Sequence, residues 1–557
     1  MTALLTNNLP LLAGAPNGIK KLRELILELA VRGKLVPQDP RDEPASELLK
    51  RIAEEKARQV SEGKIKKQKP LSGITDLDKP FPLPKGWAWL RLGDLTLTIL
   101  SGGTPSKNVP EYWGGDIPWA SVKDLNVYRD LVTTQDYITE EGLAAGSKLA
   151  KKGEVLICTR MGLGKIAVAA MDVAINQDLK ALRLTCQLNL DYFLNFYRTL
   201  SIIGSGMTVA GIKQDELLSF LVPMPPLAEQ HRIVAKVDEL MALCDRLEAR
   251  QADADSAHAQ LVQALLDRLT QARDAGDFAQ SWQRLAEHFQ TLFTTESSID
   301  ALRQTLLQLA VMGKLVPQES SDAPADELIG SIAKEIAQLH SEGKIRKPKP
   351  VSPVSTEEVG FEAPQGWRWL RLSQITRQLG DGLHGTPIYS QDGGYYFVNG
   401  NNLKDGKIVI KPETKRVSES EYSKHKNPLD EQSILVSING TIGNVAFYNY
   451  EKIVLGKSAC YLNLAGGVSK NFVRLLIEAP GFMEYALKSA TGTTIKNLGL
   501  KAMNDYPIAL PPQAEQHRIV AKVDQLMALC DQLKARLGQA RQVHEQLANA
   551  LVEQAVA

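Results

Sequence analysis

Two segments of the chain carry apolar residues at alternating intervals of four and three. The first apolar stripe consists of Ile233, Val237, Leu240, Cys244 and Leu247. The second apolar stripe consists of Ile519, Val523, Leu526, Cys530 and Leu533. This 4-3 spacing is the a/d seam of a coiled coil. Both segments are therefore predicted to form long helices with one narrow apolar face.

The two segments are nearly identical in sequence. Residues 226–250 and 512–536 differ only at the pairs Leu227/Gln513, Glu239/Gln525, Arg246/Gln532 and Glu248/Lys534. We expect the two seams to pair with each other as an antiparallel coiled coil. The alternative, a generic surface helix packed on its own domain, fits a long, narrow and duplicated stripe less well.

Paired prolines mark the start of each long helix. Residues 225–226 and 511–512 are Pro-Pro, which imposes an extended backbone before the helix and suits a first helical turn. The first helix is expected to cover about 228–269, which is on the order of 60 Å at ~1.5 Å per residue. Its stripe weakens in the middle and is expected to resume at Leu261 and Leu265.

A helical block near the N-terminus also occurs twice. Residues 19–59 are predicted to form two helices, with a break near Gly33 and Pro37. Residues 22–38 match 302–318 after a shift of 280 positions, whereas the long helices are shifted by 286. The chain therefore consists of a helical block, a variable domain and a long helix, and this series is repeated once.

The two variable domains are predicted to be α+β, with short strands and glycine turns. Residues 152–169 and 434–448 each indicate a strand, a turn and a strand. The predicted segments are 1–85 (helical block and linker), 86–225 (domain 1), 226–300 (central long helix and connector), 301–365 (repeated helical block), 366–511 (domain 2) and 512–557 (C-terminal long helix). The expected fold class is α+β, with two domains separated by two long antiparallel coiled-coil helices in a pseudo-two-fold internal repeat. The C-terminal helix is expected to lie beside the N-terminal block.

Composition limits the choice of partner and compartment only weakly. The chain has 65 Lys and Arg against 64 Asp and Glu, so any DNA-binding surface must be local. Its five cysteines form no CxxC pair and are interpreted as buried thiols in a reducing compartment. We recognise no signal peptide and no membrane-spanning segment, so the protein is expected to be cytoplasmic and to contact no membrane.

The sequence carries no complete catalytic motif. Residues 162–165 resemble a phosphate loop, but Ile166 stands where Ser or Thr is required. Residues 456–458 have the right ending, but Glu451 replaces the first glycine. Both segments are predicted to be turns, and no His or Cys cluster has metal-ligand spacing. A constant frame with two different domains indicates a binding protein, and duplex DNA with half-sites about 34 Å apart is a target of matching quasi-symmetry.

Several longer motifs identify a family. They are Pro225-Pro-Leu-Ala-Glu-Gln-His-Arg-Ile-Val234 with its repeat from Pro511, Gly102-Gly-Thr-Pro-Ser106 with Glu111-Tyr-Trp-Gly-Gly-Asp-Ile-Pro-Trp119, Asn439-Gly-Thr-Ile-Gly443, and Ala310-Val-Met-Gly-Lys-Leu-Val-Pro317. With these motifs the chain resembles the specificity subunit of type I restriction-modification systems over nearly its whole length. The segment 160–164, Arg-Met-Gly-Leu-Gly, departs from the pattern of 439–443, which leaves the geometry of that turn open.

The resemblance implies a division of labour within a complex. Each variable domain would be a target recognition domain that reads one half of a split, asymmetric DNA sequence in the major groove. The long helices would set the spacer and dock two methyltransferase (M) subunits, and restriction/translocase (R) subunits would complete the assembly. Those partners would use S-adenosylmethionine, ATP and Mg²⁺, whereas this chain would bind no cofactor and catalyse no reaction on its own.

Candidate DNA contacts follow from side-chain chemistry on expected loops. Base reading favours Arg, Lys, Asn, Gln and Ser, and phosphate contact favours Lys, Arg and small turn residues. In domain 1 the candidates are Thr104, Ser106, Lys107, Lys123, Arg160, Lys165, Lys213 and Gln214. In domain 2 they are His384, Thr386, Asn399, Asn401, Asn402, Lys404, Lys457, Lys496 and Asn497.

Two other functions remain open from the residues alone. One is a coiled-coil scaffold that presents two protein-binding modules, which predicts no dependence on DNA sequence. The other is an enzyme whose site lacks a local signature, which predicts turnover by the isolated chain. Two divergent domains on a near-constant frame favour selective recognition over both.

Overall fold

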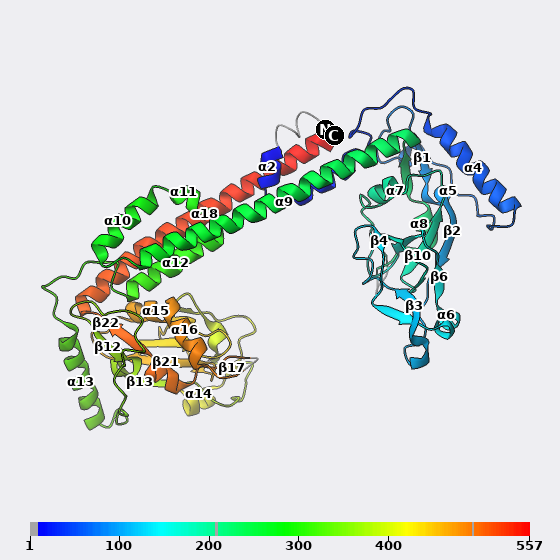
Figure 1. The fold of residues 1–557 in the computed structure, drawn as a ribbon. Helices are drawn as coiled ribbons and strands as arrows, with labels where there is room; N and C mark the ends of the chain where they lie inside the picture. The colour runs from blue at the N-terminus through cyan, green and yellow to red at the C-terminus, as the bar shows by residue number, and fades with distance from the viewer. Residues whose placement is uncertain (1–8, 206–209, 493–494, 557) are drawn as a thin grey trace. The chain divides into compact units, whose positions relative to one another are not determined.

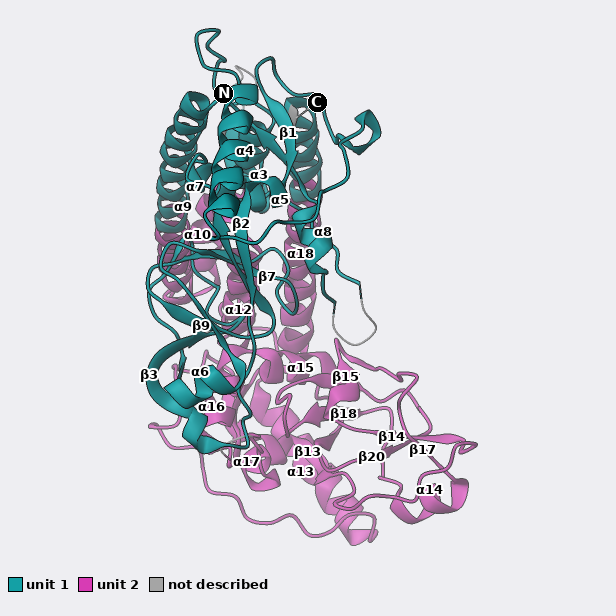
Figure 2. Ribbon diagram, turned by 90° about the vertical axis from the view of Figure 1, so that its right-hand side faces the viewer, with its two compact units in different colours: residues 1–253, 541–557 teal, residues 254–540 magenta. Residues whose placement is uncertain are grey.

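The computed structural model describes residues 9–205, 210–492 and 495–556. The chain forms two compact units (Figure 2). Unit 1 comprises residues 1–253 and 541–557, and unit 2 comprises residues 254–540.

Two helices of 44 residues, α9 (Leu227–Thr270) and α18 (Gln513–Val556), contribute to both units (Figure 1). Unit 1 holds the N-terminal part of α9 and the C-terminal part of α18, and unit 2 holds the other two parts. The helices are therefore antiparallel, as predicted. The middle of each helix contributes no fully buried residue to a core, since none is buried between Cys244 and Val262 or between Cys530 and Ala548.

Short helices accompany α9 in unit 1. They are α2 (Leu9–Gly14), α3 (Gly18–Val31), α4 (Ala45–Ser61), α5 (Leu92–Leu95), α6 (Glu140–Gly146), α7 (Leu190–Tyr197) and α8 (Gln214–Leu218), with 3-10 turns η1 (Asp76–Asp78) and η2 (Pro110–Tyr112). The apolar face of α3, which includes Leu22 and Leu25, joins the stripe of α9 in one hydrophobic cluster. Arg23 of α3 donates hydrogen bonds to Asp245 and Glu248 of α9 across this contact.

The C-terminal part of α18 lies beside the N-terminal block, as predicted. Lys21 forms an ion pair with Glu545 at 3.2 Å, and His544 Nε2 lies 2.8 Å from the carbonyl oxygen of Leu11. Ala548 is buried in the same hydrophobic cluster as α3. Residues from the two ends of the chain thus share one core.

The two apolar stripes do not pack against each other. The stripe of α9 belongs to the core of unit 1 with α3, and the stripe of α18 belongs to the core of unit 2 with α12 (Glu296–Val311). The expectation of direct seam-to-seam pairing is wrong for a geometric reason. In an antiparallel pair the N-terminal parts of the two helices, which carry the stripes, lie in different units.

The stripe of α9 also resumes one residue later than expected. Leu261 is 52% exposed, whereas Val262 and Leu266 are 3% and 1% exposed. Val262 and Leu266 pack in the core of unit 2, whereas the stripe from Ile233 to Cys244 packs in the core of unit 1.

Unit 2 repeats the helical arrangement of unit 1. Its helices are α10 (Ala275–Ala286), α11 (Phe289–Leu292), α12, α13 (Ala325–Ser341), α14 (Glu419–His425), α15 (Lys470–Glu478), α16 (Pro480–Ser489) and α17 (Leu500–Asp505), with 3-10 turns η3 (Leu372–Ile375) and η4 (Gly400–Asn402). Helix α15 lies against α12, as α7 lies against α3 in unit 1. No helix among the described residues combines the length and apolarity needed to cross a membrane.

The described strands of domain 1 form three sheets. They are β1 (Ala88–Arg91), β2 (Thr96–Ser101), β3 (Trp113–Ala120), β4 (Asp130–Leu131), β5 (Asp136–Ile138), β6 (Lys148–Ala150), β7 (Val155–Cys158), β8 (Ile166–Ala169), β9 (Val173–Ile175), β10 (Leu179–Leu184) and β11 (Leu221–Met224). The sheet orders are β1-β11, β2-β10-β7-β8-β4 and β5-β3-β9-β6. The antiparallel β1–β11 pair joins the two ends of the domain, with Ala88 opposite Met224.

Domain 2 keeps this central topology. Its strands are β12 (Arg368–Arg371), β13 (Thr376–Asp381), β14 (Tyr395–Val398), β15 (Leu403–Lys404), β16 (Lys407–Ile408), β17 (Arg416–Val417), β18 (Ser433–Ser437), β19 (Val445–Phe447), β20 (Ile453–Leu455), β21 (Ala459–Leu464) and β22 (Pro507–Leu510). The order β13-β21-β18-β19 repeats β2-β10-β7-β8, and β14 pairs parallel with β20 as β3 does with β9. The strand–turn–strand units predicted at 152–169 and 434–448 are confirmed as β7–β8 and β18–β19.

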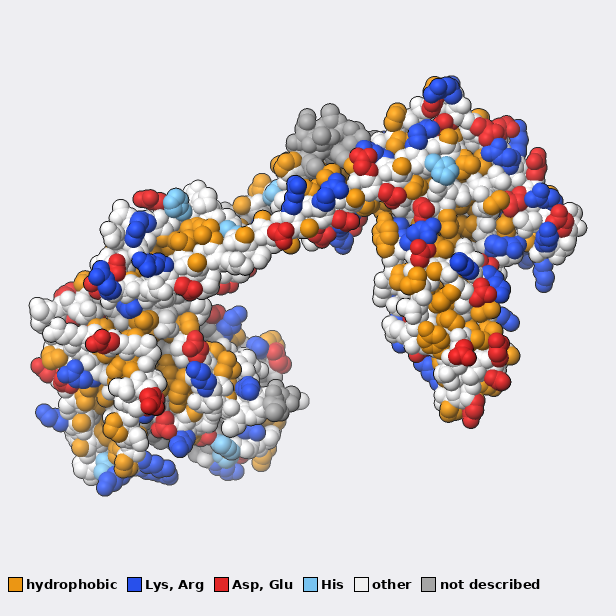
Figure 3. Space-filling view, viewed as in Figure 1, with side chains coloured by type: hydrophobic (Ala, Val, Ile, Leu, Met, Phe, Trp, Pro, Cys, Tyr) orange, Lys and Arg blue, Asp and Glu red, His pale blue; other side chains and the backbone are white. Residues whose placement is uncertain are grey.

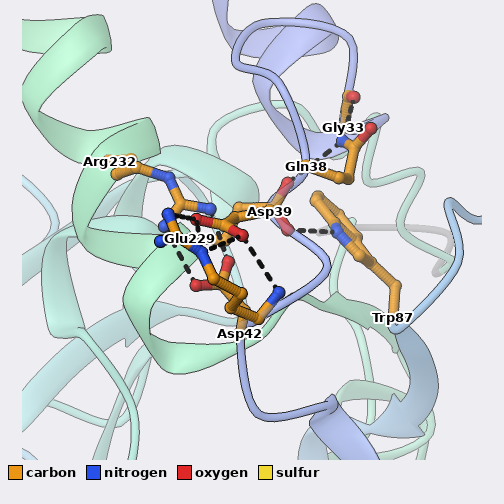
Figure 4. A network of polar contacts seen from close by, with 8 residues as sticks. Gly33, Gln38, Asp39, Asp42, Trp87, Glu229 and Arg232 are labelled. Atoms are coloured by element: carbon orange, nitrogen blue, oxygen red, sulfur yellow. Dashed lines mark hydrogen bonds and ion pairs between the residues drawn. The ribbon is translucent and has the colours of Figure 1, made fainter.

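A buried carboxylate anchors domain 1 to its long helix. Glu229, in the first turn of α9, accepts hydrogen bonds of 2.9 Å from Trp87 Nε1 and 3.1 Å from Gln38 Nε2 (Figure 4). Burial raises the pKa of the Glu229 carboxyl, and the two donors and the charge of Arg232 counteract part of that shift. Arg232 is itself held by an ion pair with Asp42. Trp87 is thus an anchor between the domain and its long helix.

The same anchor occurs in unit 2. Glu515 accepts hydrogen bonds of 2.9 Å from Trp367 Nε1 and 3.0 Å from Gln318 Nε2. Burial raises the pKa of this carboxyl as well. The duplicated sequence therefore builds one joint between domain and helix, and the joint is used twice.

Replacing Trp87 with Phe is expected to destabilise unit 1 by about 2 kcal/mol, because a buried carboxylate oxygen loses its donor. Trp89→Phe is the matched control, since Trp89 Nε1 is buried without a hydrogen-bond partner among the described residues. Urea unfolding of the two variants measures the difference. Equal losses of stability would show that ring volume, and not the bond to Glu229, matters at position 87.

Candidate nucleic-acid interface

In domain 1, loops from both larger sheets meet at a common edge. We define loop surface 1 as residues 102–106, 121–124, 160–165, 176–178 and 210–214. Strands β2, β3, β7 and β9 end at this edge and β10 begins there. Backbone bonds tie the loops together: Gly103 N donates to Ile175 O at 2.9 Å, Asn176 N to Ala120 O at 3.0 Å, and Ile212 N to Thr159 O at 2.9 Å.

Domain 2 has an equivalent set of loops. We define loop surface 2 as residues 382–386, 399–402, 439–443, 456–458 and 495–498. Gly382 N donates to Ala459 O at 3.1 Å, Gly456 N to Val398 O at 2.8 Å, and Leu498 N to Ile438 O at 2.8 Å. The two domains thus present corresponding loops on corresponding strands, although their side chains differ.

A glycine is required where the first loop crosses the turn after β9 or β20. At Gly102 an added Cβ would lie 2.0 Å from the carbonyl oxygen of Asn176. At Gly382 it would lie 2.3 Å from the carbonyl oxygen of Gly456. Both approaches are to backbone atoms, so no side-chain movement relieves them. This explains why a glycine follows β2 in domain 1 and β13 in domain 2.

Loop surface 1 collects most of the residues predicted for domain 1. Ser106, Lys107, Lys123, Arg160 and Lys213 are exposed, and Thr104, Lys165 and Gln214 are half-buried. The hydroxyl of Thr104 hydrogen-bonds to Gln177. Lys165 Nζ donates to the carbonyl oxygen of Val122 at 3.2 Å and so holds two of the loops together. Lys107 lies just beyond the first loop.

Loop surface 2 gathers the domain 2 residues less uniformly. His384, Thr386, Asn401, Lys457 and Lys496 are exposed there, and Asn399 and Asn497 are half-buried, whereas exposed Lys404 lies just beyond this surface in β15. Asn402 is buried: its side chain accepts from Asn399 N and donates to Val409 O, each at 3.0 Å. It therefore holds its loop in shape and presents no free group at the surface. His384 Nε2 forms a hydrogen bond with Asp381 Oδ2.

The divergent turn of domain 1 has the same backbone as its counterpart. Met161 has φ 60° where Gly440 has φ 75°, and Gly164 has φ 88° where Gly443 has φ 90°. The geometry that the sequence left open is thus the same in both domains. Met161 is the residue under strain, because left-handed φ costs an L-residue with a Cβ roughly 1–2 kcal/mol.

We expect Met161→Gly to stabilise domain 1 by about 1 kcal/mol, because glycine adopts this φ without steric cost. Gly440→Ala is the converse control: nothing lies within 4 Å of an added Cβ there, so only backbone strain is introduced. Thermal unfolding should shift in opposite directions for the two variants. A destabilised Met161→Gly would mean that packing of the methionine outweighs its backbone strain.

Charge on these units is mixed. On the face shown in Figure 3, Lys and Arg side chains alternate with Asp and Glu over both units, in keeping with a net charge of +1. A polyanion would therefore be held by cations placed at particular loops and not by a general positive field. Loop surface 1 supplies exposed Lys123, Arg160 and Lys213, and loop surface 2 supplies exposed Lys457 and Lys496.

Sequence reasoning missed several members of the two loop surfaces. Gln177 and Asp178 lie at the turn after β9 and contact Thr104 and Arg160. Asn439 lies in the predicted turn of residues 434–448 and is not among the predicted contacts. Comparison of the two repeats could have pointed to Gln177 and Asp178, because residues 176–178 and 456–458 occupy equivalent turns 280 positions apart.

Comparison with known proteins finds a family and several relatives. The family model for the type I restriction modification DNA specificity domain matches residues 84–254 and 385–540. The specificity subunit of the type I restriction enzyme EcoAI of Escherichia coli is 38% identical, over 97% of this chain and 94% of its own length. That of EcoEI from the same species is 36% identical over the same shares. A solved HsdS subunit from Thermoanaerobacter tengcongensis has a TM-score of 0.38 at 19% identity, covering 86% of this chain and 98% of that chain.

Proposed function

Because the chain belongs to the family of type I restriction enzyme specificity subunits, we propose that each loop surface reads one half of a split, asymmetric DNA sequence. The observation that carries this proposal is the pair of equivalent loop surfaces with different side chains. Equal loops give both domains one way of approaching a duplex, and unequal side chains give each domain its own base sequence.

The long helices would set the distance between the two half-sites and dock two methyltransferase subunits. In support, one face of α9 is exposed and recurs unchanged on α18. The exposed residues Ala228, His231, Ala235, Asp238 and Ala242 are identical to the exposed Ala514, His517, Ala521, Asp524 and Ala528. Two identical faces on one chain suit two copies of the same partner.

The proposal includes a division of chemistry, which the family resemblance implies. The methyltransferase subunits would bind S-adenosylmethionine and methylate adenine, and restriction/translocase subunits would use ATP and Mg²⁺. The specificity subunit would contribute binding energy and geometry. Its loops would hold DNA by charge-assisted contacts to phosphates and by hydrogen bonds to base edges.

Sequencing of methylated adenine in genomic DNA, with and without this gene, tests the proposal. A split motif with one methylated adenine in each half should be present in the wild type and absent in the deletion strain. Co-purification with a methyltransferase subunit is the control for silent partner genes. If such a complex forms but methylates no sequence selectively, the chain is a scaffold and the proposal fails.

A further inference from the structure

One position is equivalent in the two loop surfaces and carries a different side chain in each. In domain 1, Arg160 forms an isolated β-bridge with Gly211, and in domain 2 Asn439 forms one with Asn497. The preceding residues make the same backbone bonds, since Thr159 N donates to Asp178 O at 2.8 Å and Ile438 N to Ser458 O at 2.9 Å. Arg160 and Asn439 therefore occupy the same place in the two domains.

Arg160 is held by one edge of its guanidinium group. Its Nε lies 3.7 Å from Asp178 Oδ1, and the Arg160 side chain is 49% exposed while that of Asp178 is 12% exposed. Asp178 is fixed in turn, because Asn176 Nδ2 donates to its Oδ2 at 3.2 Å. Gly211 leaves room for the arginine stem, since a Cβ there would lie 2.8 Å from Arg160 Cγ. No described residue accepts a hydrogen bond from the two terminal nitrogens of Arg160.

Asn439 is held in an analogous way by a different partner. Its Nδ2 donates to Asn497 Oδ1 at 3.2 Å. This bond uses one of the two N–H groups on Nδ2, so the second N–H and the Oδ1 acceptor remain available. No partner for that oxygen occurs among the residues that the structure describes. The side chain thus offers one donor and one acceptor side by side.

These two patterns match different bases. Two parallel donors on arginine fit O6 and N7 of guanine, and a donor next to an acceptor on asparagine fits N7 and N6 of adenine in the major groove. We propose that this equivalent position is a base-reading position in both domains, with Arg160 reading a guanine in one half-site and Asn439 an adenine in the other. The inference rests on the proposed function, and it adds the identity of one base in each half.

The experiment uses the full chain in complex with its methyltransferase subunits. Methylation rates are measured on duplexes in which each base pair of the split motif is changed singly. With wild-type protein, one guanine in the half read by domain 1 and one adenine in the half read by domain 2 should each be discriminated by about 5- to 150-fold. A domain 1 half without guanine, or a domain 2 half whose only adenine is the methylated base, would overturn the assignment at once.

Variants then connect each base to its residue. Arg160→Gln should change the preference at the one position from guanine to adenine, because glutamine offers the donor–acceptor pair that adenine requires. Arg160→Lys keeps the charge but loses the fork, so discrimination at that position should fall while the salt dependence of binding stays the same. Asn439→Ala should relax only the adenine of the other half.

Lys123→Gln is the matched control on loop surface 1. It removes an exposed charge, and as a phosphate contact it should weaken binding to all sequences and lower the salt slope by about one, with the motif unchanged. If Arg160→Gln and Arg160→Lys behave like this control, or leave every base preference unchanged, Arg160 does not read a base. If wild-type protein methylates no split motif, the proposed function itself has failed.

Discussion

A chimaera in which residues 86–225 are replaced by the corresponding domain of another specificity subunit is expected to lose methylation at all original targets. It should gain a new motif that shares one half and the spacer with the old one. The expectation has a structural reason: β1 and β11 pair antiparallel, with Ala88 opposite Met224, so the two ends of the domain meet at one place. A graft at this place exchanges loop surface 1 and leaves loop surface 2 untouched.

The graft must keep the joint to the long helix. Trp87 bonds to Glu229 at 2.9 Å, and the backbone N–H of Asn189 donates to the side chain of Gln230 at 2.9 Å. The incoming domain should therefore carry a tryptophan and an asparagine at the positions of Trp87 and Asn189, and a chimaera that lacks both is the control for a broken joint. Sequencing of methylated DNA reads out the result. A change in both halves of the motif would contradict independent recognition domains.

The second large effect is expected from lengthening both long helices. Insertion of four helical residues after Arg250 in α9 and after Arg536 in α18 adds about 6 Å at ~1.5 Å per residue. The spacer of the methylated motif should then grow by about two base pairs at ~3.4 Å per pair, with both halves unchanged. The insertions fall where neither helix contributes a buried residue, so the fully buried residues of each core keep their places.

An insertion in α9 alone is the control for this prediction. Both helices contribute to both cores, so a change in one of them disturbs their register, and methylation should fall without a new defined spacer. Methylome sequencing of the two strains distinguishes the cases. A double insertion that methylates the original motif at the original spacing would refute the role of the helices as a ruler.

The sequence by itself determined the repeated plan of this protein. The limits of α9 agree with the paired prolines and the apolar stripe, and the strand–turn–strand units lie where alternation and glycine turns placed them. These features depend on local periodicity and on comparison of one half of the chain with the other, so they can be read without the fold. The resemblance of the motifs to one family has the same origin.

Only the tertiary structure decided which surfaces meet. The stripe of Ile233 packs with α3 and not with the stripe of Ile519, because an antiparallel arrangement places the two stripes in different cores. Likewise Asn402 is buried, whereas Asn439 contacts Asn497 across 58 residues of sequence. Periodicity fixes the face of an element, but the neighbour of that face depends on the path of the whole chain.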